Sequence, residues 1–257
     1  MLHLRYKSNS IIKIASDIPY GATCVLDGVE TEIKGSIFLA SSDDKDEVNV
    51  VFTDFVPVID FRRSNIIAVL SPVLPVKSLT CMFEGCRLLT TVCEDLLINN
   101  TEHTNLTGMF KNCESFDINK NLGVFKPLKS VKSVNHMLDN TGIKLLDNKT
   151  LAATCFDNLT TAVNLCSNCC SLRYINSDSI SRLTKLVFID GIFKYCVSLQ
   201  SIPNGTFSSL TMLKSATGAF KAASSLKVVN KNLGCEFPSS CNITGMFTGT
   251  KIRIHRK

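Results

Sequence analysis

A repeated pattern of apolar residues, spaced 27 or 28 positions apart, constrains this chain more than any other feature. In its clearest copy, residues 191–210, Phe193 is followed at intervals of three residues by Cys196, Leu199 and Ile202. The positions equivalent to Phe193 are Phe83, Phe110, Leu138, Cys166, Phe193, Phe220 and Phe247. A unit of this length cannot bury its apolar side alone. Consecutive copies must therefore pack on one another and share a core.

Two further positions of the repeat keep their character. Three residues after the Phe position stand small side chains: Cys86, Cys113, Thr141, Cys169, Cys196, Ala223 and Thr250. Three residues later stand larger ones: Leu89, Phe116, Leu172, Leu199 and Leu226. We expect equivalent residues to lie over each other as internal columns, with the small residue where neighbouring backbones approach closely.

The repeat resembles a known family. MFKNCESF (109–116) and IFKYCVSLQSI (192–202) resemble the BspA-type leucine-rich repeats of bacterial surface proteins, and the T-G-M-F variant at 107–110 and 244–247 is similar to the longer bacterial subtype. The resemblance covers about residues 61–257. It implies a right-handed solenoid with one short parallel strand per turn, and adhesion to or recognition of a protein or glycan. It carries no catalytic motif.

The first 60 residues do not follow the repeat. Apolar and polar residues alternate at 2–6, 12–14, 24–26, 31–33, 37–39 and 48–52, which predicts short strands, and Asp27-Gly28 predicts a hairpin turn. Residues 1–60 are therefore expected to be a small β-rich element, and 61–257 a leucine-rich-repeat solenoid with atypical terminal turns. The predicted fold class is α/β: an all-β element followed by a right-handed solenoid of about seven 27–28-residue turns, with a helical or 3₁₀ piece near 207–213.

Twelve cysteines invite three interpretations. Buried cysteine acts as a small hydrophobe, which suits the repeat positions and is the interpretation we favour. Disulfides would suit an oxidising compartment. Zinc would suit the spacing of Cys166, Cys169 and Cys170, but no second C-x-x-C or histidine pair lies nearby. We predict no metal site and no cofactor.

Composition and motifs narrow the function classes. The net charge of +6, from 28 basic and 22 acidic residues, is mild and scattered, which disfavours nucleic-acid binding. No apolar run is long enough for a membrane span, and the first residues do not read as a signal peptide because Lys13 interrupts their apolar run. There is no phosphate-binding glycine loop, zinc-protease motif or nucleophile elbow. The chain is therefore predicted not to be an enzyme.

A binding face is expected where variable residues follow the Leu column. One or two places after that column, the side chains should point to solvent along the strands. The candidate stripe consists of Thr90, Thr91, Asp117, Arg173, Tyr174, Gln200, Ser201 and Lys227. Its alternative is an ordinary solvated sheet face.

The function expected from these observations is structural or recognitional. The first hypothesis is a bacteriophage virion component (fibre, tail or capsid-associated) that uses the repeats for assembly or receptor attachment, with the virion surface as its location. The second is a secreted bacterial surface adhesin that binds host protein or glycan, located outside the cell or on its surface. The third is a cysteine-ligated metal or redox protein. Expected partners are proteins or glycans, including other virion proteins, and a homo-oligomer fits the first hypothesis.

Overall fold

The computed structural model describes residues 1–42, 45–53, 55–151, 153–229 and 233–252. Six strands occupy the first 52 residues: β1 (Leu2–Lys7), β2 (Ser10–Lys13), β3 (Thr23–Leu26), β4 (Val29–Glu32), β5 (Ile37–Ala40) and β6 (Glu47–Phe52). All six were predicted from the alternation of apolar and polar residues, and that prediction is confirmed. In β1, for example, Leu2, Leu4 and Tyr6 are buried while the residues between them are not.

The turn between β3 and β4 is also confirmed. Leu26 pairs with Val29, so only Asp27 and Gly28 form the connection. Both have positive φ values, 47° and 93°, as a two-residue turn matched to the twist of a hairpin requires.

The N-terminal sheet continues past residue 60. β7 (Ile66–Val69) pairs antiparallel with β1, and β8 (Thr91–Val92) pairs parallel with β7. The result is a six-stranded mixed sheet in the order β4-β3-β6-β1-β7-β8, with β2 and β5 forming a separate antiparallel pair. The first repeats are thus joined to the N-terminal element by backbone hydrogen bonds.

The later strands are two residues long. Three of them end at the Ile or Val that follows the S-L pair of the repeat, and the fourth lies in the divergent unit that reads NTGIKLL. These strands are β9 (Leu145–Leu146), β10 (Tyr174–Ile175), β11 (Ser201–Ile202) and β12 (Val228–Val229), paired in parallel as β9 with β10 and β11 with β12. Four short 3₁₀ helices complete the elements of the described residues: η1 (Ile118–Lys120), η2 (Leu122–Phe125), η3 (Thr154–Asn158) and η4 (Leu233–Glu236).

The predicted fold class is wrong. Across the described residues the chain forms strands, 3₁₀ turns and coil with no α-helix, and the architecture is a six-stranded mixed sheet with small two-stranded sheets rather than an α/β leucine-rich-repeat solenoid. Residues 207–213, expected to be helical or 3₁₀, form successive i→i+3 turns, such as Leu210 N–H to the Phe207 carbonyl (3.0 Å). Pro203, Gly205 and Ser208 at and before this segment are weak helix formers.

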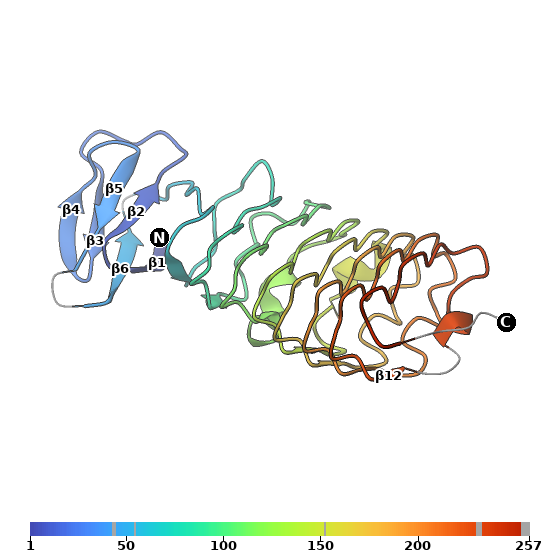
Figure 1. Cartoon of the computed structure of the whole chain (residues 1–257). Helices are drawn as coiled ribbons and strands as arrows, with labels where there is room; N and C mark the ends of the chain where they lie inside the picture. The colour runs from blue at the N-terminus through green and yellow to red at the C-terminus, as the bar shows by residue number, and fades with distance from the viewer. Residues whose placement is uncertain (43–44, 54, 152, 230–232, 253–257) are drawn as a thin grey trace.

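Backbone hydrogen bonds link residues 26 to 28 positions apart. One column of single parallel bridges runs through Asn105, Ser133, Thr161, Phe188, Ser215 and Asn242. Next to this column, every second residue donates its N–H to a carbonyl of the following unit, and these bonds form a ladder between units. For example, Phe193 N–H donates to the Ala219 carbonyl at 2.8 Å. Figure 1 shows the corresponding coils following one another from teal to red. In the clearest copy the ladder includes residues 187–195 and 200–202, and residues 203–213 outside it form local i→i+3 turns.

Aromatic rings at the Phe position stack inside these coils. The centroids of Phe83 and Phe110 are 5.4 Å apart with nearly parallel planes, and those of Phe220 and Phe247 are 5.3 Å apart. Phe61 extends the first stack, 5.0 Å from Phe83. Aromatic contacts at this spacing are favourable beyond the area they bury.

Candidate functional site

Three residues of the expected binding stripe lie on consecutive backbone rungs. The N–H of Gln200 donates to the carbonyl of Arg173 at 3.1 Å, and the N–H of Lys227 donates to the carbonyl of Gln200, also at 3.1 Å. All three side chains are exposed. Neither Arg173 nor Lys227 forms an ion pair with a described residue.

Tyr174 and Ser201 extend this group by one position. Tyr174 begins β10 and is 50% exposed, while Ser201 begins β11 and is half-buried. We call Arg173, Tyr174, Gln200, Ser201 and Lys227 the C-terminal stripe. It combines two cations, an amide, a hydroxyl and an aromatic ring on a regular backbone, which is a surface able to bind a polar or acidic partner.

The other three predicted residues lie elsewhere. Thr90 and Thr91 belong to the edge of the six-stranded sheet, where Thr90 N–H bonds the Ile67 carbonyl at 2.9 Å and Thr91 pairs with Ala68. Asp117 is not on a strand. It caps the short 3₁₀ helix η1, and its carboxylate accepts from the N–H of Asn119 at 3.0 Å.

Two asparagine side chains separate the two groups. Asn121 accepts from Val92 N–H (2.9 Å) and donates to the Thr90 carbonyl (3.2 Å), while Asn119 donates to the Leu145 carbonyl at 2.6 Å. These side chains form hydrogen bonds with backbone N–H and carbonyl groups that would otherwise pair with a neighbouring strand. Sequence reasoning missed them, although the run Asp-x-Asn-x-Asn at 117–121 was the signal available.

The repeated cysteines are interior residues with a shared hydrogen bond. Cys86, Cys113, Cys169 and Cys196 are free, fully buried thiols. Each lies close to the carbonyl oxygen of the Phe-position residue one unit earlier, at 2.8, 2.9, 3.0 and 3.0 Å respectively. Burial raises the pKa of the Cys86 thiol to about 11 and raises that of Cys196 well above its ordinary value. The thiols of Cys86, Cys113 and Cys196, whose pKa values are all raised, are therefore protonated near neutral pH and unsuited to nucleophilic chemistry. Against the effect of burial, hydrogen bonds from Cys166 and Thr141 instead lower the pKa of Cys169, which is buried and out of reach of solvent.

Metal ligation finds no support in the described part of the chain. No group of three or more histidine, cysteine, aspartate or glutamate side chains there is arranged to hold an ion. His136 binds Asp139 through Nδ1 at 2.9 Å, and Asn168 donates to the other carboxylate oxygen at 2.9 Å. This pair satisfies a buried carboxylate between adjacent units. Among the described residues, no helix is long and apolar enough to cross a membrane.

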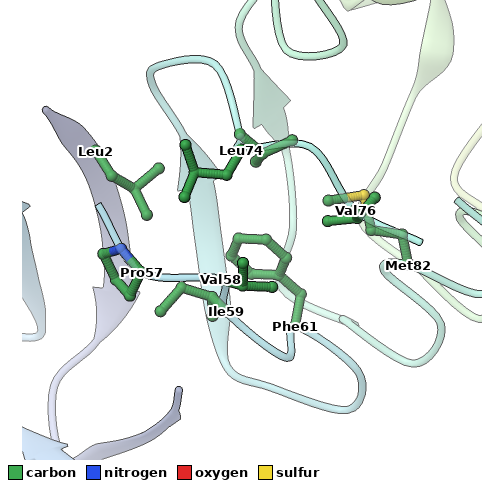
Figure 2. A pocket seen from close by; sticks show the side chains of 9 residues that line it. Leu2, Pro57, Val58, Ile59, Phe61, Leu74, Val76 and Met82 are labelled. Atoms are coloured by element: carbon green, nitrogen blue, oxygen red, sulfur yellow. The ribbon is translucent and has the colours of Figure 1, made fainter. Parts of the chain in front are cut away.

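A cleft at the junction of the N-terminal sheet and the first repeats was not anticipated. Figure 2 shows the side chains at its narrow inner end, among them Leu2, Val58 and Phe61. The hollow that they line has a volume of about 10 Å³. An adjoining hollow of about 560 Å³ shares Val58 and Phe61. It adds a polar rim that includes Asp60, Arg62, Lys77, Ser78 and Thr80.

Two opposite charges at this rim, those of Arg62 and Asp60, neutralise each other. The guanidinium of Arg62 binds the Asp60 carboxylate through two contacts of 2.9 Å and holds the pKa of that carboxyl below its usual range. The cleft joins segments around residues 58 and 77, which are distant along the chain. No local pattern could therefore have indicated it.

Comparison with known proteins assigns the chain to no family. No protein-family model matches the chain, and no curated protein matches it at a significant level.

Proposed function

We propose that this chain is a non-enzymatic recognition and assembly protein, and specifically a bacteriophage virion component that attaches to a protein or glycan receptor. The observation that carries the proposal is the C-terminal stripe, in which Arg173, Gln200 and Lys227 lie on consecutive hydrogen-bonded rungs. The sequence resemblance to bacterial surface-protein repeats supports the same class of function.

The geometry suits recognition because it is fixed before a partner arrives. Neighbouring strands lie about 4.8 Å apart, so side chains on consecutive rungs hold a constant spacing. A surface ordered in advance loses less conformational entropy on binding. Tyr174 offers the type of residue that anchors many interfaces. Arg173 and Lys227 form no ion pair with a described residue, and their charges would attract acidic groups.

Binding of the labelled chain to arrayed glycans and to bacterial cells tests the attachment role. We expect saturable binding that the double variant Arg173→Ala/Tyr174→Ala reduces at least about tenfold, a loss of about 1.4 kcal/mol. Thr90→Ala is the matched control, because Thr90 is exposed but lies apart from the stripe. Equal binding by the double variant and the wild type would contradict the proposal.

Solution mass tests the assembly role. A virion component should form a stable closed oligomer, measured by light scattering with and without reductant. A monomer would favour the second candidate, a bacterial surface adhesin that uses the same stripe. A mass that changes with reductant would contradict the assignment of the repeated cysteines as buried free thiols.

A further inference from the structure

A polar notch opens on another edge of the repeats, away from the C-terminal stripe. Two positions after each Phe position, the backbone is left-handed in eight successive units. The residues are Arg63, Gly85, Asn112, Asn140, Asn168, Tyr195, Ala222 and Gly249. Their side chains form a column along the edge, in which Asn140 donates to Asn112 at 3.2 Å. Gly85 contributes no side chain to this column.

Gly85 lines a hollow of about 460 Å³, together with Arg63, Asn65, Arg87 and Asn112. The stem of Arg63 lies over the glycine, because a Cβ atom on Gly85 would come within 3.0 Å of Arg63 Cγ. The volume falls within the range of small-ligand pockets, about 300–1,000 Å³. The notch is therefore large enough for a small polar molecule.

The lining is cationic. It contains two guanidinium groups and two amides, and no acidic side chain. Arg87 contacts Glu114 at 3.3 Å, but both side chains of this pair are largely exposed, so the pair is weak. Arg63 forms no ion pair with any described residue, and the nearby Glu84 carboxylate is bound by Lys111 at 3.3 Å.

Arg63 is also an unusual residue for its backbone. Its φ value of 55° is a conformation that disfavours side chains other than those of glycine, asparagine and aspartate. Gly85 and Asn112, its successors in the column, fit that conformation better. Tyr195 and Ala222 share this conformation at equivalent positions, so it belongs to the turn of each unit, and it places Arg63 at the edge where the notch opens.

We propose that this notch binds an oxyanion carried by a small hydroxylated molecule, such as a sugar acid or a sugar phosphate. The planar guanidinium groups match carboxylate or phosphate oxygens in a paired geometry. The Asn65 and Asn112 amides can both donate to and accept from hydroxyl groups. The absence of apolar side chains from the lining disfavours a hydrophobic ligand.

The notch continues toward the N-terminal element. A second hollow of about 270 Å³ shares Arg63 and Asn65 and adds the side chains of Asn9 and Lys13. Asp60 also lines it, but its carboxylate is engaged by Arg62. The two hollows share Arg63 and form a mainly polar groove, in which Ile11 is the apolar member, so a ligand longer than one sugar unit would also be accommodated.

Calorimetric titration of the full chain with glucuronate, glucose 6-phosphate, inorganic phosphate and glucose tests this site. We expect saturable binding of at least one of the first two below about 20 mM, with inorganic phosphate weaker and glucose not binding. Tighter binding of glucuronate identifies a carboxylate ligand, and tighter binding of glucose 6-phosphate identifies a phosphate ligand. Failure of both to bind would overturn the proposal, as would equal binding of glucose.

Three variants locate the site. Arg63→Gly removes the guanidinium and places glycine at a left-handed position, so it should fold and weaken binding at least about tenfold. Gly85→Asn keeps both arginines but fills the notch with a residue tolerated elsewhere in the column, and should weaken binding to a similar degree. Lys149→Ala removes one positive charge at an exposed position outside both the notch and the C-terminal stripe, and should leave binding unchanged. Equal weakening by Lys149→Ala would show a general charge effect and overturn the site.

Discussion

The thiol of Cys113 donates a hydrogen bond to the backbone carbonyl oxygen of Phe83, with Sγ and O 2.9 Å apart. The same oxygen accepts the N–H of Cys86 within its own unit. The position therefore calls for a small side chain, and a thiol there adds a hydrogen bond to the unit before. Thr141 at the equivalent position instead donates to the Leu138 carbonyl of its own unit at 2.9 Å, and Ala223 keeps only the small size.

Chemical labelling should separate the buried repeat cysteines from the exposed Cys170. We expect iodoacetamide at pH 7.5 to modify Cys170, whose side chain is exposed, while Cys86 and Cys113 stay unmodified in the folded chain. Burial withholds these thiols from the reagent, and raised pKa values keep them protonated. Peptide mass spectrometry measures the modification, and the chain in guanidinium chloride is the control in which all should react. Modification of Cys113 before unfolding would contradict the burial.

Stability should fall in alkaline solution. Burial raises the pKa of Cys86 from 9.0 to about 11 and that of Cys155 to about 12, so these thiols stay protonated in the folded chain after the unfolded chain has lost its protons. The free energy of unfolding is then fully present below pH 9 and declines above it, by up to about 1.4 kcal/mol per pH unit for each such thiol. Urea unfolding at pH 8 and pH 10.5 measures the decline. A Cys86→Ala variant should show a smaller decline in the free energy of unfolding than the wild type. An equal decline in the two proteins would refute the raised pKa of Cys86.

Replacing Asn121 should loosen the end of the six-stranded sheet. Asn121→Ala leaves the buried N–H of Val92 without its acceptor, which we expect to lower the free energy of unfolding by about 1–3 kcal/mol. Hydrogen exchange at the Val92 amide should accelerate as well. Asn176→Ala, at an exposed position, is the control and should change neither quantity. Unaltered exchange at Val92 in the Asn121 variant would be inconsistent with this role.

Gly142 is expected to tolerate no side chain. A Cβ atom there would lie 2.7 Å from the backbone carbonyl oxygen of Glu114, which cannot rotate away. Gly142→Ala should therefore destabilise the chain by about 1–3 kcal/mol, measured by denaturant unfolding. Ser171→Ala, at an exposed turn position, serves as the control. If both variants unfold at the wild-type midpoint, the close approach is absent in solution.

Part of the candidate site followed from the sequence. The periodicity correctly placed Arg173, Gln200 and Lys227 at equivalent exposed positions, because a fixed repeat length brings equivalent residues onto neighbouring rungs. It did not reveal that Asp117 would cap a turn, since that depends on asparagine side chains competing with strand pairing. The periodicity did not reveal the notch either. The missing side chain at Gly85 leaves a binding-sized hollow only because the fold places Arg63 and Arg87 beside it.

The sequence by itself determined the apolar columns, the short strands and the N-terminal hairpin. Each depends on local periodicity or on residues whose conformational preferences act within a few positions. Tertiary structure decided the rest. The 27–28-residue units close through left-handed turns and backbone ladders instead of helices, and the N-terminal sheet grows into the first repeats through β7 and β8. Those outcomes depend on hydrogen bonds between distant segments, whose pairing no single stretch of sequence specifies.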